Sequence, residues 1–155
     1  VMDQSEPIQT ANQLFTLNVL GSSILINGRD DPLRWVISVD GQAPIDPGAD
    51  GIAMVDVAPG DTIEWQSESG FHGLTFEAFT EAQTFLEFSS QNIAFSPQVR
   101  FGADARGTDG QAGSPGNAVV LAHATVRQSA ASALTFTCTI HGSPGTTTMD
   151  GRLIR

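Results

Sequence analysis

The chain contains a single cysteine, Cys138, among its 155 residues. One cysteine excludes an internal disulfide. In a secreted protein a lone thiol is a liability unless burial or a metal occupies it. The chain also lacks any apolar run that approaches the roughly 20 residues needed to span a bilayer.

Lysine is absent, and 17 acidic residues stand against seven arginines, so the formal net charge is −10. A polyanion without a visible basic patch should bind neither nucleic acid nor an anionic membrane. The acidity would either steer a cationic partner or solvate the surface in a salty habitat, and both readings stay open.

Short alternating segments separated by turn residues predict a protein built from strands. The chain has 16 glycines and eight prolines to make those turns. Turns are expected at 27–32, 40–41 and 59–61. Residues 81–88 are ambiguous between a helical turn and a strand, and we favour a strand from Thr84 onward. The expected strands are 13–20, 23–26, 35–39, 52–57, 62–66, 72–79, 119–126 and a last one from Leu134 to Cys138.

This pattern predicts an all-β fold, a Greek-key β-sandwich. Residues 1–12 are polar and patternless and are expected to form a flexible N-terminal arm. Residues 13–155 would then form a single domain. Residues 96–117 are rich in glycine, proline and polar groups, so we interpret them as a long surface loop insertion.

The strongest chemical signal lies near the C-terminus. Leu134, Phe136 and Cys138 alternate with threonines, which places the thiol at the end of a core-facing row. His141 follows, then a loop rich in glycine and proline, and then Met149. Thiolate, thioether and imidazole ligands suit copper better than magnesium or calcium, which prefer oxygen.

These motifs resemble the blue (type 1) copper proteins, or cupredoxins, and most nearly the plastocyanin-like members. The resemblance covers residues 52–79 and 119–155 and implies a cupredoxin-like sandwich with one copper ion that cycles between Cu(I) and Cu(II). It implies that the ligands are His72, Cys138, His141 and, as a weak axial thioether, Met149. It rests on Cys138-x-x-His141, Met149-x-Gly151-x-Leu153, the run Val57–Trp65 and the Gly70-Phe-His72 sequence.

Two departures from the family pattern concern the surroundings of the metal. Seven residues separate His141 from Met149, where plastocyanin-like members usually have fewer. Gly73 stands where the family often has asparagine or serine. Its N–H can still bond the thiolate, but no side chain at this position pins the cysteine loop.

Each candidate ligand also has a simpler interpretation. A lone cysteine is usually a small buried hydrophobe, a histidine on a loop is often only a satisfied polar residue, and Met149 could be core packing. His123, in the middle of an expected strand and away from both ligand stretches, is expected to be structural or exposed. The combination of motifs in the right order favours the ligand interpretation.

The resemblance implies a soluble, monomeric, non-enzymatic one-electron carrier between transient redox partners such as cytochromes or oxidases. We expect it to be periplasmic or otherwise extracytoplasmic, with any signal segment removed before Val1. His141 would be the route for the electron, within an apolar patch of Phe71, Ile140, Gly142 and Pro144.

Three alternatives come from other classes. The first is a protein for copper delivery or storage, although the chain shows no Met/His cluster for metal exchange. The second is a metal-free cupredoxin-like interaction domain, against which the full ligand set argues. The third, an oxidase or nitrite reductase, needs additional histidine-bound copper, and three histidines leave one to spare.

Overall fold

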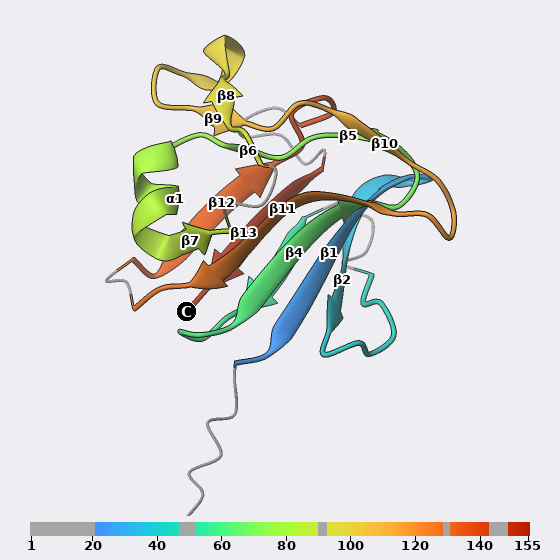
Figure 1. The fold of residues 1–155 in the computed structure, drawn as a ribbon, viewed down its shortest axis with the longest axis horizontal. Coiled ribbons are helices and arrows are strands. Elements are labelled where there is room, and N and C mark those ends of the chain that lie inside the picture. Colours follow the sequence, from blue (N-terminus) through green and yellow to red (C-terminus); the bar gives the residue numbers. More distant parts are fainter. Residues whose placement is uncertain (1–20, 47–51, 90–92, 129–130, 143–148) are drawn as a thin grey trace, which may run out of the picture.

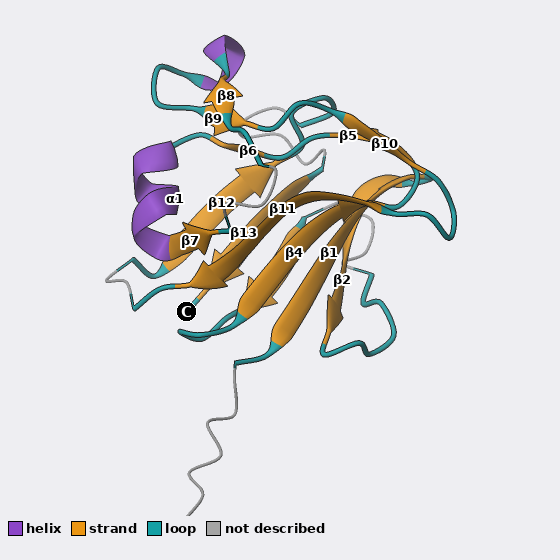
Figure 2. Ribbon diagram, in the orientation of Figure 1, coloured by secondary structure: helices purple, strands orange, loops and turns teal. Residues whose placement is uncertain are grey.

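The structure, a computed structural model, describes residues 21–46, 52–89, 93–128, 131–142 and 149–155. It confirms the all-β sandwich: two multi-stranded sheets enclose one core, and a two-stranded pair lies at one end (Figures 1 and 2). The Greek-key connection stays a prediction. The expected arm at 1–12 and the expected strand at 13–20 lie outside the described residues.

The first sheet has five strands, in the order β2-β1-β4-β11-β7. In β4 the side chains of Ile63, Trp65 and Ser67 are buried and alternate with partly exposed residues, as a sheet with one core face requires. The pairing of β1 with β4 is parallel, and the other pairs are antiparallel. The strands are β1 (Ser23–Asp30), β2 (Leu33–Val39), β4 (Thr62–Ser67), β7 (Leu86–Phe88) and β11 (Val119–Val126).

The second sheet has six strands, in the order β3-β13-β12-β6-β9-β8, and β10 pairs separately with β5. In β12, Leu134 and Phe136 face the core while Thr135 is exposed, as the alternation predicts. The strands are β3 (Ala53–Asp56), β5 (Gly70–His72), β6 (Thr75–Phe76), β8 (Ser96–Pro97), β9 (Arg106–Gly107), β10 (Gln111–Gly113), β12 (Ala133–Thr137) and β13 (Asp150–Ile154).

Aromatic side chains join the two sheets. The ring of Phe136, on β12, lies 5.9 Å from the ring of Trp35 and 5.5 Å from that of Trp65, both on the first sheet. All three side chains are almost completely buried. Edge-on packing of this kind favours the pair energetically beyond the area it buries. It therefore sets the two sheets in a defined position relative to each other.

The expectation of a strand from Thr84 onward is wrong for its first two residues. Helix α1 (Phe79–Phe85) includes Thr84 and Phe85, and β7 starts at Leu86. Asp104, distant in sequence, satisfies the helix N-terminus: its carboxylate accepts the Thr80 N–H at 3.1 Å and its carbonyl accepts the Phe79 N–H at 3.1 Å. Hydrogen bonds from the Thr80 hydroxyl and from the Thr80 N–H lower the pKa of Asp104. In the described part of the chain, no helix is long and apolar enough to cross a membrane.

The turn expected at 27–32 is shorter than predicted. Asn27 and Gly28 belong to β1, and the chain turns only at residues 31–32. The strand continues because Gly28 packs against buried side chains: a Cβ there would lie 2.9 Å from the Met149 methyl group and 3.0 Å from the His72 ring. The turns at 40–41 and 59–61 are confirmed, with Gly60 at φ +95°.

The expected strand 72–79 is interrupted: β5 ends at His72, β6 covers residues 75–76 and α1 begins at Phe79. Residues 96–117, predicted as an insertion, contain β8, β9, β10 and a 3₁₀ turn, η1 (Val99–Phe101). The segment folds back over the top of the sandwich, where β9 pairs with β6 and β10 pairs with β5 (Figure 1). It therefore packs beside β5, which ends at His72, and beside β6, which follows it.

Substituting Gly151 tests the packing between β12 and β13. A Cβ at Gly151 would lie 2.1 Å from Phe136 Cζ, within the aromatic core. We expect Gly151→Ala to lower the free energy of unfolding by about 1–3 kcal/mol in urea denaturation of the metal-free protein. Thr135→Ala, on the exposed face of β12, is the control and should change it by no more than about 0.5 kcal/mol. Equal effects of the two changes would contradict the packing described.

Candidate metal centre

The turn between β4 and β5 positions His72. Gly70 adopts φ +70°, a conformation that glycine reaches without steric cost, and it starts β5. In β5, Phe71 points outward with 49% of its surface exposed, while His72 is completely buried. The pairing of His72 with Gln111 of β10 covers this strand from the other side. The imidazole therefore faces the interior at the end of the sandwich.

A tight turn after β12 brings Cys138 and His141 together. The Gly142 N–H donates to the Cys138 carbonyl at 2.8 Å, so the chain folds back over one turn. The Cys-x-x-His spacing matters because this turn brings the His141 imidazole close to the Cys138 thiol. Cys138 is completely buried, whereas His141 is half-buried.

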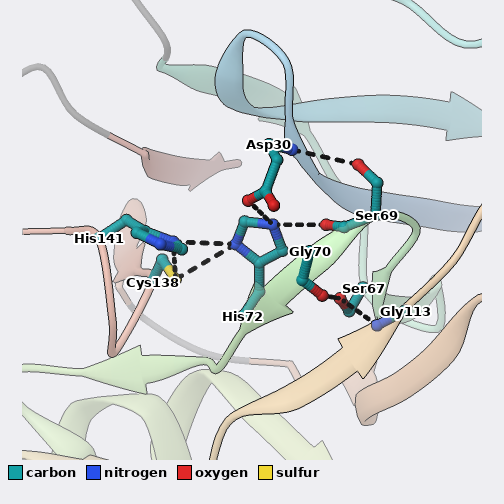
Figure 3. A network of polar contacts seen from close by, with 8 residues as sticks. All are labelled: Asp30, Ser67, Ser69, Gly70, His72, Gly113, Cys138 and His141. Carbon is teal, nitrogen blue, oxygen red and sulfur yellow. Dashed lines mark hydrogen bonds and ion pairs between the residues drawn. The ribbon is translucent and has the colours of Figure 1, made fainter.

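Three ligand atoms converge at this point (Figure 3). The Cys138 Sγ lies 3.7 Å from Nδ1 of His72 and 3.7 Å from Nδ1 of His141, and the two nitrogens are 3.2 Å apart. A metal bound at about 2.0 Å to nitrogen and 2.3 Å to sulfur would leave its ligands roughly 3–4 Å apart. The group of His72, Cys138 and His141 could therefore hold one metal ion.

Met149 lies next to this group. Its side chain is completely buried, and its methyl group and the His72 ring both lie over Gly28. Its backbone is left-handed, at φ +54°, which is costly for a residue with a side chain. Its carbonyl accepts the indole N–H of Trp35 at 2.8 Å and the Cys138 N–H at 3.1 Å. Strain that the surroundings maintain in this way is typical of functional positions; the axial role of Met149 stays a prediction.

Hydrogen bonds from Thr139 hold the turn that carries Cys138 and His141 (the ligand turn), although Gly73 has no side chain that could do so. The Thr139 hydroxyl is hydrogen-bonded to that of Thr75 at 2.6 Å, and the Thr139 N–H donates to the Gly73 carbonyl at 3.2 Å. Among the described residues, the Cys138 sulfur contacts the two imidazoles rather than the Gly73 N–H. Thr139 therefore pins the cysteine turn instead of a side chain at position 73.

Arg100 gives the insertion a direct role at the site. Its guanidinium donates to the carbonyl of Thr139 and, at 3.2 Å, to that of Gly142. It also stacks over Phe101, 4.4 Å from the ring centre. These two carbonyls flank Ile140 and His141, so a residue about 40 positions earlier fixes the ligand turn. Nothing in the local sequence marks Arg100 for this role.

The other predicted residues fall in three places. Phe71 and Ile140 are exposed beside the candidate ligands, as expected for an apolar patch, whereas Gly142, expected in the same patch, is buried, and Pro144 lies outside the described residues. His123 is half-buried on β11 opposite Glu64 and borders a shallow groove on the outer face of the first sheet. It does not belong to the His72 group.

Burial is the main influence on the ionisation of His72. Desolvation lowers the pKa of His72, and the neighbouring His141 lowers it further. Asp30 and the Ser69 carbonyl act in the opposite direction. The lowered pKa keeps the imidazole neutral, and a neutral imidazole is the form that binds a metal.

Comparison of the chain with protein-family models, with curated proteins and with solved structures finds no significant match.

The lowered pKa of His72 predicts how the metal-free protein responds to acid. The unfolded chain takes up the proton near the ordinary pKa of about 6.5, whereas folded His72 resists it. Its contribution to stability is therefore complete above that pH and is lost as the pH falls through the folded pKa. NMR titration of the His72 ring should give a pKa below 6.5, and urea unfolding should become easier as the pH falls below that value. His72→Asn should weaken this pH dependence. A His72 pKa at or above the ordinary value would show that burial does not control its ionisation.

Proposed function

We propose that this chain is a mononuclear blue (type 1) copper protein of the cupredoxin family that carries one electron at a time between larger redox proteins. The observation that carries the proposal is the convergence of one thiol and two imidazoles at bonding distances from a single point. The ligand set agrees with the family resemblance of the sequence. In this proposal the protein is a carrier and not an enzyme.

The ligand chemistry favours copper over other metals. Two histidines and a cysteine in a plane, with a weak thioether above it, are diagnostic of electron-transfer copper sites. Zinc also accepts imidazole and thiolate, but its structural sites have four strong ligands. Near the three donors of this site lies Met149, which is buried and whose methyl group lies over Gly28, as the His72 ring does.

Bound copper would supply a one-electron couple between Cu(II) and Cu(I). The chain's own contribution is a ligand frame that is already closed: Thr139 and Arg100 hold the turn, and the Met149 carbonyl bonds the Cys138 N–H. A frame fixed by neighbouring groups keeps its shape when the charge at its centre changes. The burial of His72 and Cys138 also excludes water from two of the three ligands.

His141 is the ligand that reaches the surface. It is half-buried, and Phe71 and Ile140, with 49% and 39% of their surface exposed, lie next to ligands in the chain. A small apolar patch fits the weak and transient interfaces of redox partners. The net charge of −10 would steer a cationic partner toward the protein. The extracytoplasmic location and the monomeric state stay predictions from the sequence.

Copper delivery or storage is the alternative function. A delivery protein must release its metal to an acceptor, which requires ligands that an incoming group can reach. Here His72 and Cys138 are completely buried, and Arg100 fastens the turn that carries Cys138 and His141. These features favour movement of an electron over movement of the metal.

Removing the thiol tests the ligand set. The copper(II)-loaded protein should show an intense visible absorption band from charge transfer between the Cys138 sulfur and copper, and Cys138→Ala should abolish it. His123→Ala removes a histidine outside the group and is the matched control, since it should leave the band unchanged. An intense band in the Cys138→Ala protein would show that this thiol is not the ligand.

A charge at the apolar patch separates the carrier from the delivery protein. Phe71→Glu should slow electron exchange with a cytochrome, measured by stopped flow, and leave copper affinity nearly unchanged because Phe71 points away from the ligands. Met54→Glu introduces the same charge on the exposed face of β3, which carries no ligand, and should have a smaller effect. Transfer of copper to a chelator is followed in parallel. Rapid copper transfer combined with slow electron exchange in the wild type would establish delivery instead.

A further inference from the structure

The carboxylate of Asp30, the last residue of β1, contacts the buried candidate ligand His72. The Asp30 Oδ1 lies 3.2 Å from His72 Nε2, the ring nitrogen that faces away from Cys138 (Figure 3). The same Nε2 lies 2.8 Å from the Ser69 carbonyl oxygen. The imidazole is completely buried, whereas 49% of the Asp30 side chain is exposed. Asp30 therefore links a buried ligand to a charge at the protein surface.

The surrounding structure holds Asp30 in this position. Its N–H donates to the Ser69 hydroxyl at 3.1 Å, and the Glu68 N–H donates to the Gly28 carbonyl at 3.0 Å. Arg29 and Glu68 form an ion pair at 2.8 Å across the same junction. These contacts tie the end of β1 to the turn that leads into β5.

Gly70 leaves room for the carboxylate. A Cβ at this position would lie only 1.6 Å from an Asp30 carboxylate oxygen, so the side chain fills the space beside the glycine. The conformation of the turn and the placement of Asp30 therefore depend on the same residue. This close fit distinguishes Asp30 from a surface carboxylate that lies near a histidine by chance.

The two acceptors determine which nitrogen of His72 carries the proton. With Nε2 donating toward Ser69 and Asp30, the lone pair of the neutral ring is on Nδ1, the atom that faces Cys138 and His141. The Ser69 carbonyl supplies a neutral acceptor. Asp30 adds a full negative charge, which increases the basicity of Nδ1 as carboxylate–histidine pairs do at metal sites.

We propose that Asp30 is a positioning residue that makes His72 a stronger donor and thereby lowers the reduction potential of the bound metal. The potential falls because a more negative ligand set stabilises the oxidised ion, which has the higher charge, more than the reduced ion. This inference rests on the proposed one-electron function, although its effect on metal affinity does not. Asp30 acts through His72 and does not itself bind the metal.

The expected size follows from similar partners of ligand histidines. Removing such a partner typically weakens metal binding by about 10- to 100-fold. Because half of Asp30 is exposed and the Ser69 carbonyl remains, the lower end applies, roughly tenfold. We assign this tenfold loss to the oxidised ion, whose higher charge interacts more strongly with Asp30, and such a loss raises the potential of a one-electron couple by about 59 mV.

The experiment compares Asp30→Asn with Asp31→Asn in the full chain. Asn keeps the shape of Asp30 and removes its charge, while Asp31→Asn removes the same charge from the next residue, in the exposed turn. Two quantities are measured: the reduction potential of the copper-loaded protein and the affinity of the metal-free protein for Zn²⁺, which has no redox chemistry. Asp30→Asn should raise the potential by about 59 mV and weaken Zn²⁺ binding about tenfold. Asp31→Asn should change both much less.

Equal shifts in the two variants would overturn the inference, because they would show a general effect of surface charge. Unchanged potential and Zn²⁺ affinity in Asp30→Asn, with lower stability in urea, would also overturn it and leave Asp30 a structural tie. In a third outcome, the wild type shows no reversible one-electron couple, while Asp30→Asn still binds Zn²⁺ about tenfold more weakly than the wild type. That result would contradict the proposed function and support the effect of Asp30 on His72. If Asp30→Asn fails to fold, Asp30→Ser provides the same uncharged test at this position.

Discussion

The carbonyl of Met149 is the point on which the ligand-bearing end of the molecule depends. It accepts one hydrogen bond from the Trp35 indole of the first sheet and one from the Cys138 N–H, just beyond β12 of the second sheet. Buried hydrogen bonds of this kind are costly to leave unmade. By satisfying both donors, Met149 places its own side chain beside Gly28, holds the thiol at the end of β12 and fastens one sheet to the other.

The rest of the site consists of a buried frame with one open edge. Aromatic packing of Phe136 against Trp35 and Trp65 sets the sheets beneath it, and Arg100 holds the ligand turn from above. His72 and Cys138 lie inside this frame, whereas His141 reaches the surface. In the proposed carrier this division is useful, since a rigid interior limits rearrangement while one ligand edge stays accessible to a partner.

Periodicity and local motifs in the amino-acid sequence were enough to predict several of the strands and two of the candidate ligands. Alternation predicted the sandwich, with β11 at its observed bounds and the core-facing row that ends at Cys138. The Cys-x-x-His spacing predicted that Cys138 and His141 lie together, because four residues can close one turn. That His72 joins them followed only from the family resemblance, since no local pattern relates residues 66 positions apart.

Other features depend on contacts between residues far apart in the sequence, and these became visible only in the folded chain. Asp104 starts a helix at Phe79, where the local sequence was ambiguous. Gly28 resembles a turn residue but lies inside a strand, because its missing side chain makes room for Met149 and His72. Thr139, Arg100 and Asp30 support the candidate ligands through partners 39 to 66 residues away, and such partners leave no periodic trace along the chain. The candidate ligands could be predicted because only a few amino acids bind such metals. Many residues can supply a supporting hydrogen bond, and only the fold determines which of them does.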